Sequence, residues 1–96
     1  MENTTRILVV DNNQNVTNRI KEQFSSHAVI KVVKTIENGQ EALDYILENK
    51  NEFDCLIMDL ILPEIDGLTI LEQMKQKNIR KKVIILTSYK KEYTIN

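Results

Sequence analysis

The chain has 96 residues, of which 42% are hydrophobic, and its 13 Lys and Arg nearly balance its 14 Asp and Glu. This length predicts one small domain, and the hydrophobic content suffices for a packed core and argues against disorder. The near-neutral charge, the single cysteine and the lack of a long apolar segment argue against direct nucleic-acid binding, an internal disulfide and membrane insertion. We therefore expect a soluble cytoplasmic protein.

The first strand and helix are predicted from residues 6–25. The β-branched run Ile7–Val10 predicts a buried strand that ends at Asp11. Asn12 and Asn13 follow it, as a turn residue and a helix N-cap. A helix is predicted over residues 13–25, because apolar side chains recur there every four positions. Those side chains belong to Val16, Ile20 and Phe24.

A second strand, a second helix and a third strand follow. Residues 29–36 predict a strand, and Lys31 and Lys34 indicate an edge position with one wetter face. After the turn signal Asn38-Gly39, an i, i+4 repeat of apolar residues predicts the second helix. Residues 53–58 predict a third strand that is buried on both faces and has Cys55 in the core.

The last predicted elements are a helix after Gly67 and a strand over residues 83–86, which ends at Thr87. The inward-facing residues of this helix are expected to be Leu68, Leu71 and Met74. Strands and helices then alternate as βαβαβαβ. This alternation predicts an α/β fold with a doubly wound parallel sheet and right-handed crossovers.

Polar side chains stand at the carboxyl ends of three predicted strands, at Asp11, Asp59 and Thr87. Parallel strands end at the same edge of a sheet, where ligands bind in open α/β folds. Two carboxylates and a hydroxyl at that edge would favour Mg²⁺. A carboxylate beside Mg²⁺ is also a plausible nucleophile toward a phosphoryl group.

Four segments resemble the receiver domain of two-component response regulators. They are Ile7–Asp11, Asn38–Leu43, Asp54–Gly67 and Val83–Ser88. The second of these segments also resembles the sporulation master-regulator branch of that family. The resemblance implies a flavodoxin-like fold with strand order 2-1-3-4. It also implies a signalling role in a two-component system or phosphorelay, rather than that of a turnover enzyme.

The resemblance implies a role for several residues. Asp59 would accept a phosphoryl group from a histidine kinase or phosphotransferase. Thr87 would be the switch hydroxyl. The implied Mg²⁺ ligands are Asp11, Asn12, Asp59 and the backbone carbonyl of Ile61. Pro63 and Gly67 would shape the loop after the third strand, with a positive φ at the glycine.

The chain departs from the family at two places. Asn12 stands where receivers usually carry a second acid, so we expect weakened Mg²⁺ binding. The last helix, strand and helix that receivers usually have find no counterpart in this sequence. We therefore expect a receiver over residues 1–96 that is truncated after the fourth strand. The lysine of the fifth strand has no counterpart: Lys81 and Lys82 would lie at the opposite edge, and only Lys90 or Lys91 could substitute.

The exposed fourth strand leads to a further expectation, that of a homodimer or strand-exchanged oligomer. Two alternatives to a phosphorylated receiver stay open. One is a degenerate receiver that acts as a phosphorylation-independent binding module. The other is a Mg²⁺-dependent phosphatase, which is disfavoured because Ile61 replaces a second acid. Glu64 and Asp66 are expected to be solvated loop acids.

Overall fold

The computed structural model describes residues 3–86 and contains four strands and three helices within them. These are β1 (Thr5–Val10), α1 (Gln14–Phe24), β2 (Ile30–Ile36), α2 (Gly39–Glu48), β3 (Cys55–Asp59), α3 (Gly67–Gln76) and β4 (Lys82–Leu86). The strands form one parallel sheet in the order β2-β1-β3-β4, as expected. Within this part of the chain, no helix has the length and apolarity needed to cross a membrane.

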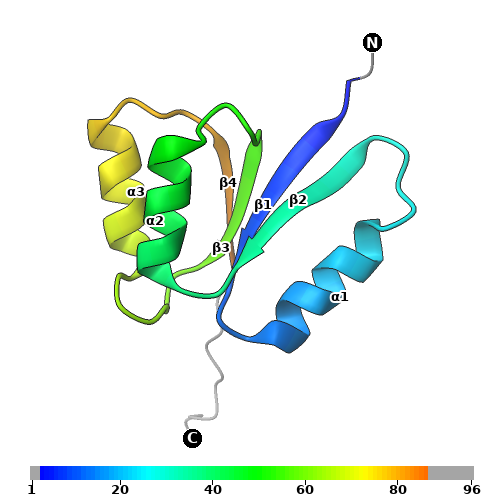
Figure 1. Cartoon of the computed structure of the whole chain (residues 1–96), viewed down its shortest axis with the longest axis horizontal. Helices are drawn as coiled ribbons and strands as arrows, with labels where there is room; N and C mark the ends of the chain where they lie inside the picture. Colours follow the sequence, from blue (N-terminus) through cyan, green and yellow to red (C-terminus); the bar gives the residue numbers. More distant parts are fainter. Residues whose placement is uncertain (1–2, 87–96) are drawn as a thin grey trace, which may run out of the picture.

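The sheet divides the hydrophobic core into two clusters, because successive side chains on a strand point to opposite faces. Helices α2 and α3 cover one face, and α1 lies on the other (Figure 1). Leu8, Val10, Leu56 and Met58 pack toward α2 and α3. Ile7, Val9, Cys55 and Ile57 form the second cluster, which includes Ile20 and Phe24 of α1. The core position expected for Cys55 is thus confirmed.

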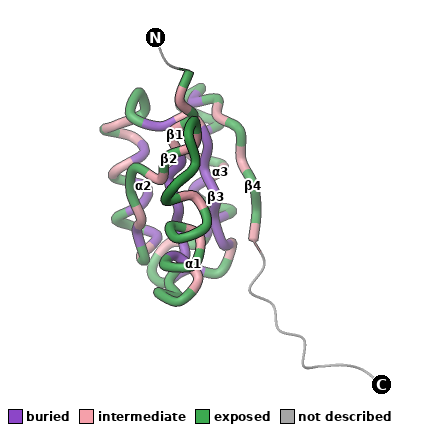
Figure 2. The backbone as a smooth tube through the Cα atoms, turned by 90° about the vertical axis from the view of Figure 1, so that its right-hand side faces the viewer, coloured by how far each residue is buried: buried purple, intermediate pink, exposed green. Residues whose placement is uncertain are grey.

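The edge strands differ from the central ones in burial. Figure 2 shows β3 as buried along its length, while β4 consists of exposed and intermediate residues. The edge position expected for β2 is confirmed, and both of its lysines are exposed. Its register against β1 shifts between Ile7 and Leu8, so that Val33 has no partner and is exposed.

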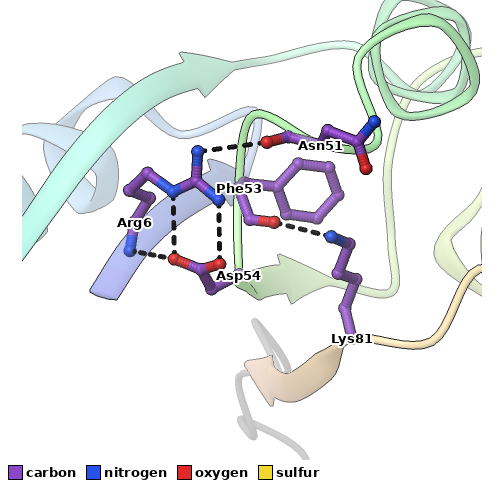
Figure 3. A network of polar contacts seen from close by, with 5 residues as sticks. All are labelled: Arg6, Asn51, Phe53, Asp54 and Lys81. Atoms are coloured by element: carbon purple, nitrogen blue, oxygen red, sulfur yellow. Dashed lines mark hydrogen bonds and ion pairs between the residues drawn. The ribbon is translucent and has the colours of Figure 1, made fainter. Parts of the chain in front are cut away.

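Strand β3 begins at Cys55, two residues later than expected. Phe53 is fully buried, but it precedes the strand, and its carbonyl accepts a hydrogen bond of 2.7 Å from Lys81 Nζ. The Asp54 side chain turns aside to bind Arg6 (Figure 3). The predicted strand 53–58 therefore includes one core residue, Phe53, that belongs to the turn before β3.

The expected inward face of α3 was wrong at Leu68, which is 59% exposed. The helix starts at Gly67, and the buried residues Gly67, Ile70 and Met74 follow i, i+3, i+7 spacing. Leu68 lies one residue, or about 100° of helix, away from this face. Leu71 packs partly against the core, and Met74 is buried as expected.

Candidate functional site

Asp11 and Asp59 lie next to each other at the carboxyl edge of the sheet. Asp11 follows β1 and Asp59 ends β3, and these two strands are hydrogen-bonded neighbours with Val10 paired to Met58. Both acids are only 2% exposed. The expected convergence of these two strand ends is therefore confirmed by the geometry.

Each carboxylate is oriented by one backbone donor. The Asn13 N–H donates to Asp11 Oδ1 over 2.8 Å, and the Ile61 N–H donates to Asp59 Oδ1 over 3.0 Å. Neither Oδ2 atom accepts a hydrogen bond from another residue in the range 3–86. Each acid thus keeps one oxygen without a partner among the described residues.

The two acids share a weakly solvated environment. Burial raises the pKa of Asp11, the Asn13 N–H bond opposes this rise, and the nearby Asp59 charge adds to it. The ion pair found among the described residues, Arg6–Asp54, does not involve either acid. A cation between them would therefore relieve both the burial cost and the repulsion.

The residues around these acids offer further oxygen ligands, one from a side chain and one from the backbone. Asn12 adjoins Asp11 and is exposed, and Ile61 adds a backbone carbonyl two residues after Asp59. No group of three or more His, Cys, Asp or Glu that could hold a metal occurs in residues 3–86. Mg²⁺ is bound through one or two carboxylates and retains water, so this set of oxygens fits it.

The loop between β3 and α3 folds back onto β3. Gly67 donates to the Leu60 carbonyl over 2.8 Å. A Cβ on Gly67 would lie 2.8 Å from Leu60 Cα and 2.9 Å from the Asp59 carbonyl oxygen. The expected positive φ is wrong for Gly67; Glu64 has it instead, with a φ of 71°. Close approach of the backbone, and not a left-handed conformation, requires glycine at position 67.

The same loop is held by the start of α2. The Gly39 N–H donates to the Pro63 carbonyl over 3.0 Å, and a Cβ on Gly39 would overlap the Ile65 carbonyl. Asn38 caps the helix by accepting from the Gln40 and Glu41 N–H groups. The sequence indicated only a turn at Asn38-Gly39, because a contact with a loop some 25 residues away leaves no local signal.

Asp66 has a structural role that the sequence analysis missed. It is exposed, as expected for a solvated loop acid, but it is also the N-cap of α3 and accepts from the Thr69 N–H over 2.9 Å. This hydrogen bond lowers the pKa of Asp66. An acid just before a helix beginning at Gly67 was the available signal.

Other predicted residues lie away from the site or outside the described residues. Lys81 donates to the carbonyl of Phe53 at the amino edge of the sheet, which confirms that it lies far along the strands from Asp59. Thr87, Lys90 and Lys91 lie outside the described residues.

The fold and the two acids can be compared with those of known protein families. The family model for the response regulator receiver domain matches residues 7–96. The chain therefore belongs to the response regulator receiver family.

Individual relatives agree with this assignment. The chain is 24% identical over 90 residues to the transcriptional regulatory protein CitT of Halalkalibacterium halodurans, covering 94% of this chain and 39% of that protein. It is 32% identical over 87 residues to the protein-glutamate methylesterase/protein-glutamine glutaminase 1 of Methanospirillum hungatei, covering 91% and 25%. The chain thus spans less than half the length of either relative.

A solved structure confirms the fold. The signal receiver domain of the putative response regulator NarL from Mycobacterium tuberculosis matches with a TM-score of 0.81 and 18% identity. The match covers 96% of this chain and 72% of that chain. At this identity, the likeness establishes the flavodoxin-like receiver architecture.

Proposed function

We propose that this chain is a phosphoacceptor receiver that takes a phosphoryl group on Asp59 with Mg²⁺ bound beside it. The observation that carries the proposal is the buried pair Asp11 and Asp59, in which each acid has one oxygen without a partner among residues 3–86. Burying two such carboxylates side by side opposes folding unless a cation or ligand compensates. Membership of the receiver family supports the same role.

The described hydrogen bonds suit Asp59 to nucleophilic attack. Its Oδ1 accepts from the Ile61 N–H, which orients the carboxylate and leaves Oδ2 to attack phosphorus. The new O–P bond forms as the N–P bond of a partner's phosphohistidine breaks, and the electron pair of that bond stays with the imidazole. Thr87, which lies outside the described residues, is proposed as the switch hydroxyl.

The oxygens proposed to hold Mg²⁺ come from Asp11, Asn12, Asp59 and the Ile61 backbone carbonyl. When bound, Mg²⁺ would offset the negative charge of the carboxylates and of the incoming phosphoryl oxygens. Two acids, rather than the three that receivers usually have here, predict weaker metal binding. The proposed phosphodonor is a histidine kinase or phosphotransferase in the cytoplasm, and the proposed receiver unit spans residues 1–96.

The test is phosphorylation by a small donor. The chain is incubated with acetyl phosphate and Mg²⁺, and its intact mass is measured. We expect a gain of one phosphoryl group that disappears in Asp59→Asn and without Mg²⁺. The matched control is Asp66→Asn, which removes an acid from the same loop but retains an N-cap side chain, and it should be labelled like the wild type.

The other outcomes identify the alternatives. Continuous release of inorganic phosphate without accumulation of labelled protein would indicate the phosphatase. A chain that gains no mass under any condition would indicate a binding module that works without phosphorylation.

We also propose the binding and dimerisation module as a second candidate function, which one observation favours. In β4, an edge strand of the described sheet, Ile84 is 46% and Ile85 is 37% exposed. Such a strand offers apolar side chains and backbone groups to a second copy. Sedimentation velocity should show a dimer that dissociates in Ile84→Lys, and a monomer at high concentration would contradict this.

A further inference from the structure

Positive charge gathers at the amino edge of the sheet, opposite the acidic pair. Residues 73–86 contain five Lys and Arg and no Asp or Glu, although the whole chain has a net charge of -1. The five are Lys75, Lys77, Arg80, Lys81 and Lys82. Lys50, in the turn between α2 and β3, adds a sixth cation at this edge.

Two adjoining hollows lie among these cations. The first, of about 320 Å³, is lined by Lys75, Asn78, Ile79 and Arg80. The second, of about 200 Å³, shares the last three of these residues and adds Lys50, Asn51 and Lys81. Four cations therefore line the two hollows, and no acid lines either.

The segment between the hollows has a defined backbone. Asn78 follows the C-cap of α3 and lies in the left-handed region, with a φ of 59°. Its N–H donates to the Lys75 carbonyl over 3.0 Å, and the Ile79 N–H donates to the Met74 carbonyl over 2.8 Å. These two bonds form a Schellman motif. Ile79 is buried in the core, so the backbone that carries Arg80 is anchored.

The cationic side chains are also oriented. Arg80 Nε donates to Asn78 Oδ1 over 3.2 Å, which leaves the two terminal nitrogens of the guanidinium without a protein partner among residues 3–86. Lys81 Nζ lies 4.9 Å from the centre of the Phe53 ring and donates to the Phe53 carbonyl. An ammonium has three donors, so Lys81 can still bind an anion.

Structural compensation explains only part of this charge. Helices α2 and α3 end at this edge, and each helix C-terminus carries about half a negative charge. The two ends together offset about one cation, while four cations line the hollows. The nearby Asp54 is already paired with Arg6, and the exposed acids Glu48 and Glu52 flank Lys50 but line neither hollow.

We propose that the two hollows bind a small anion with linked phosphate groups, such as pyrophosphate or the polyphosphate of a nucleotide. Each hollow has cations on its wall, and Arg80 belongs to both, so two connected anionic groups match the site better than one. The free end of a guanidinium binds phosphate oxygens in pairs, and the lysines add point charges. The site lies at the opposite edge from Asp59 and does not depend on phosphoryl transfer there.

The test is calorimetric titration of the 96-residue chain with pyrophosphate at low ionic strength. We expect binding that Arg80→Gln weakens about tenfold, the effect of losing a charge-assisted hydrogen-bonded pair. Lys50→Gln should weaken it by less. The matched control is Arg19→Gln on α1, which removes the same charge from an exposed position that lines neither hollow. This variant should bind pyrophosphate like the wild type.

Further ligands distinguish the source of the phosphate. Tighter binding of ATP than of tripolyphosphate would support a nucleotide, and equal binding would support inorganic polyphosphate. The proposal is overturned if pyrophosphate does not bind, or if Arg80→Gln and Arg19→Gln weaken it equally. Binding of an acidic peptide or a single-stranded oligonucleotide in the absence of pyrophosphate binding would also overturn it. Thermal unfolding of each variant confirms that the fold is retained.

Discussion

Arg6 and Asp54 form an ion pair that joins β1 to the residue preceding β3. Arg6 Nη2 lies 3.0 Å from Asp54 Oδ1, and Arg6 Nε lies 3.1 Å from Asp54 Oδ2. The backbone N–H of Arg6 also donates to Asp54 Oδ2, and Arg6 Nη1 donates to the Asn51 carbonyl. One arginine therefore ties β1 to the turn that precedes β3 (Figure 3).

This pairing predicts a pH-dependent stability. The hydrogen bonds from Arg6 lower the pKa of Asp54 from 3.8 to about 2. A carboxyl with a lowered pKa in the folded state stabilises the protein above its unfolded pKa, and this stabilisation is lost as the pH falls from about 3.8 to about 2. At pH 7, Asp54→Asn should lower the free energy of unfolding by about 1 kcal/mol, after a reduction for solvent screening.

Urea denaturation at several pH values checks this prediction. The difference between wild type and Asp54→Asn should shrink below pH 3.8. The control is Glu48→Gln, which removes an exposed acid of α2 that forms no ion pair within residues 3–86, and it should change the free energy of unfolding at pH 7 little. A difference that stays constant down to pH 2 would count against the ion pair.

Gly39 should resist substitution by alanine, although alanine is the better helix former. A Cβ at this position would overlap the Ile65 carbonyl, so the loop or α2 must move. We expect Gly39→Ala to destabilise the fold by about 2 kcal/mol, which exceeds the roughly 1 kcal/mol gained in helix propensity. Gln40→Ala, at the next and exposed position, should change the unfolding midpoint little. An unchanged midpoint in Gly39→Ala would show that the contact is not tight.

Asn12→Asp should strengthen Mg²⁺ binding. The substitution adds a negative charge beside Asp11, and a unit charge about 4 Å from an ion is worth on the order of 4 kcal/mol before solvation offsets most of it. We expect about a tenfold gain in affinity. Asn13→Asp is the matched control, because it adds the same charge while retaining the N-cap of α1. Equal Mg²⁺ affinities in wild type and Asn12→Asp would falsify the assignment of Asn12.

Asp11→Asn should stabilise the protein at neutral pH in metal-free buffer. Burial raises the pKa of Asp11, which means that its charged form is disfavoured in the folded state. The asparagine keeps an oxygen for the Asn13 N–H and carries no charge. The urea midpoint of the variant should therefore exceed that of the wild type at pH 7, and the gain should fade on acidification. Added Mg²⁺ should stabilise the wild type but not the variant.

The sequence was a reliable guide to the elements and to their order. Apolar runs at Ile7–Val10 and Cys55–Met58 identify buried strands, because a strand covered on both faces has few polar residues. The alternation with amphipathic helices limits the fold to a parallel sheet. The acids after these two runs were sufficient to predict a shared edge, since parallel strands end on the same side.

The tertiary structure decided why particular glycines are needed. Gly39 and Gly67 both face another segment's backbone at close range, a property that no local pattern records. The exposure of Leu68 and the capping by Asp66 depend on the residue at which α3 begins. The second hollow around Arg80 forms only when the turn after α2 meets the loop after α3.

The sequence by itself determined the α/β architecture and placed Asp59 at the end of a buried strand, because hydrophobic periodicity is a local property. Only the tertiary structure decided which segments press on the loop between β3 and α3, and that the turn after α2 brings Lys50 to the cations of residues 75–82. Each of these depends on contacts between residues far apart in the chain, and such contacts exist only after the strands have paired.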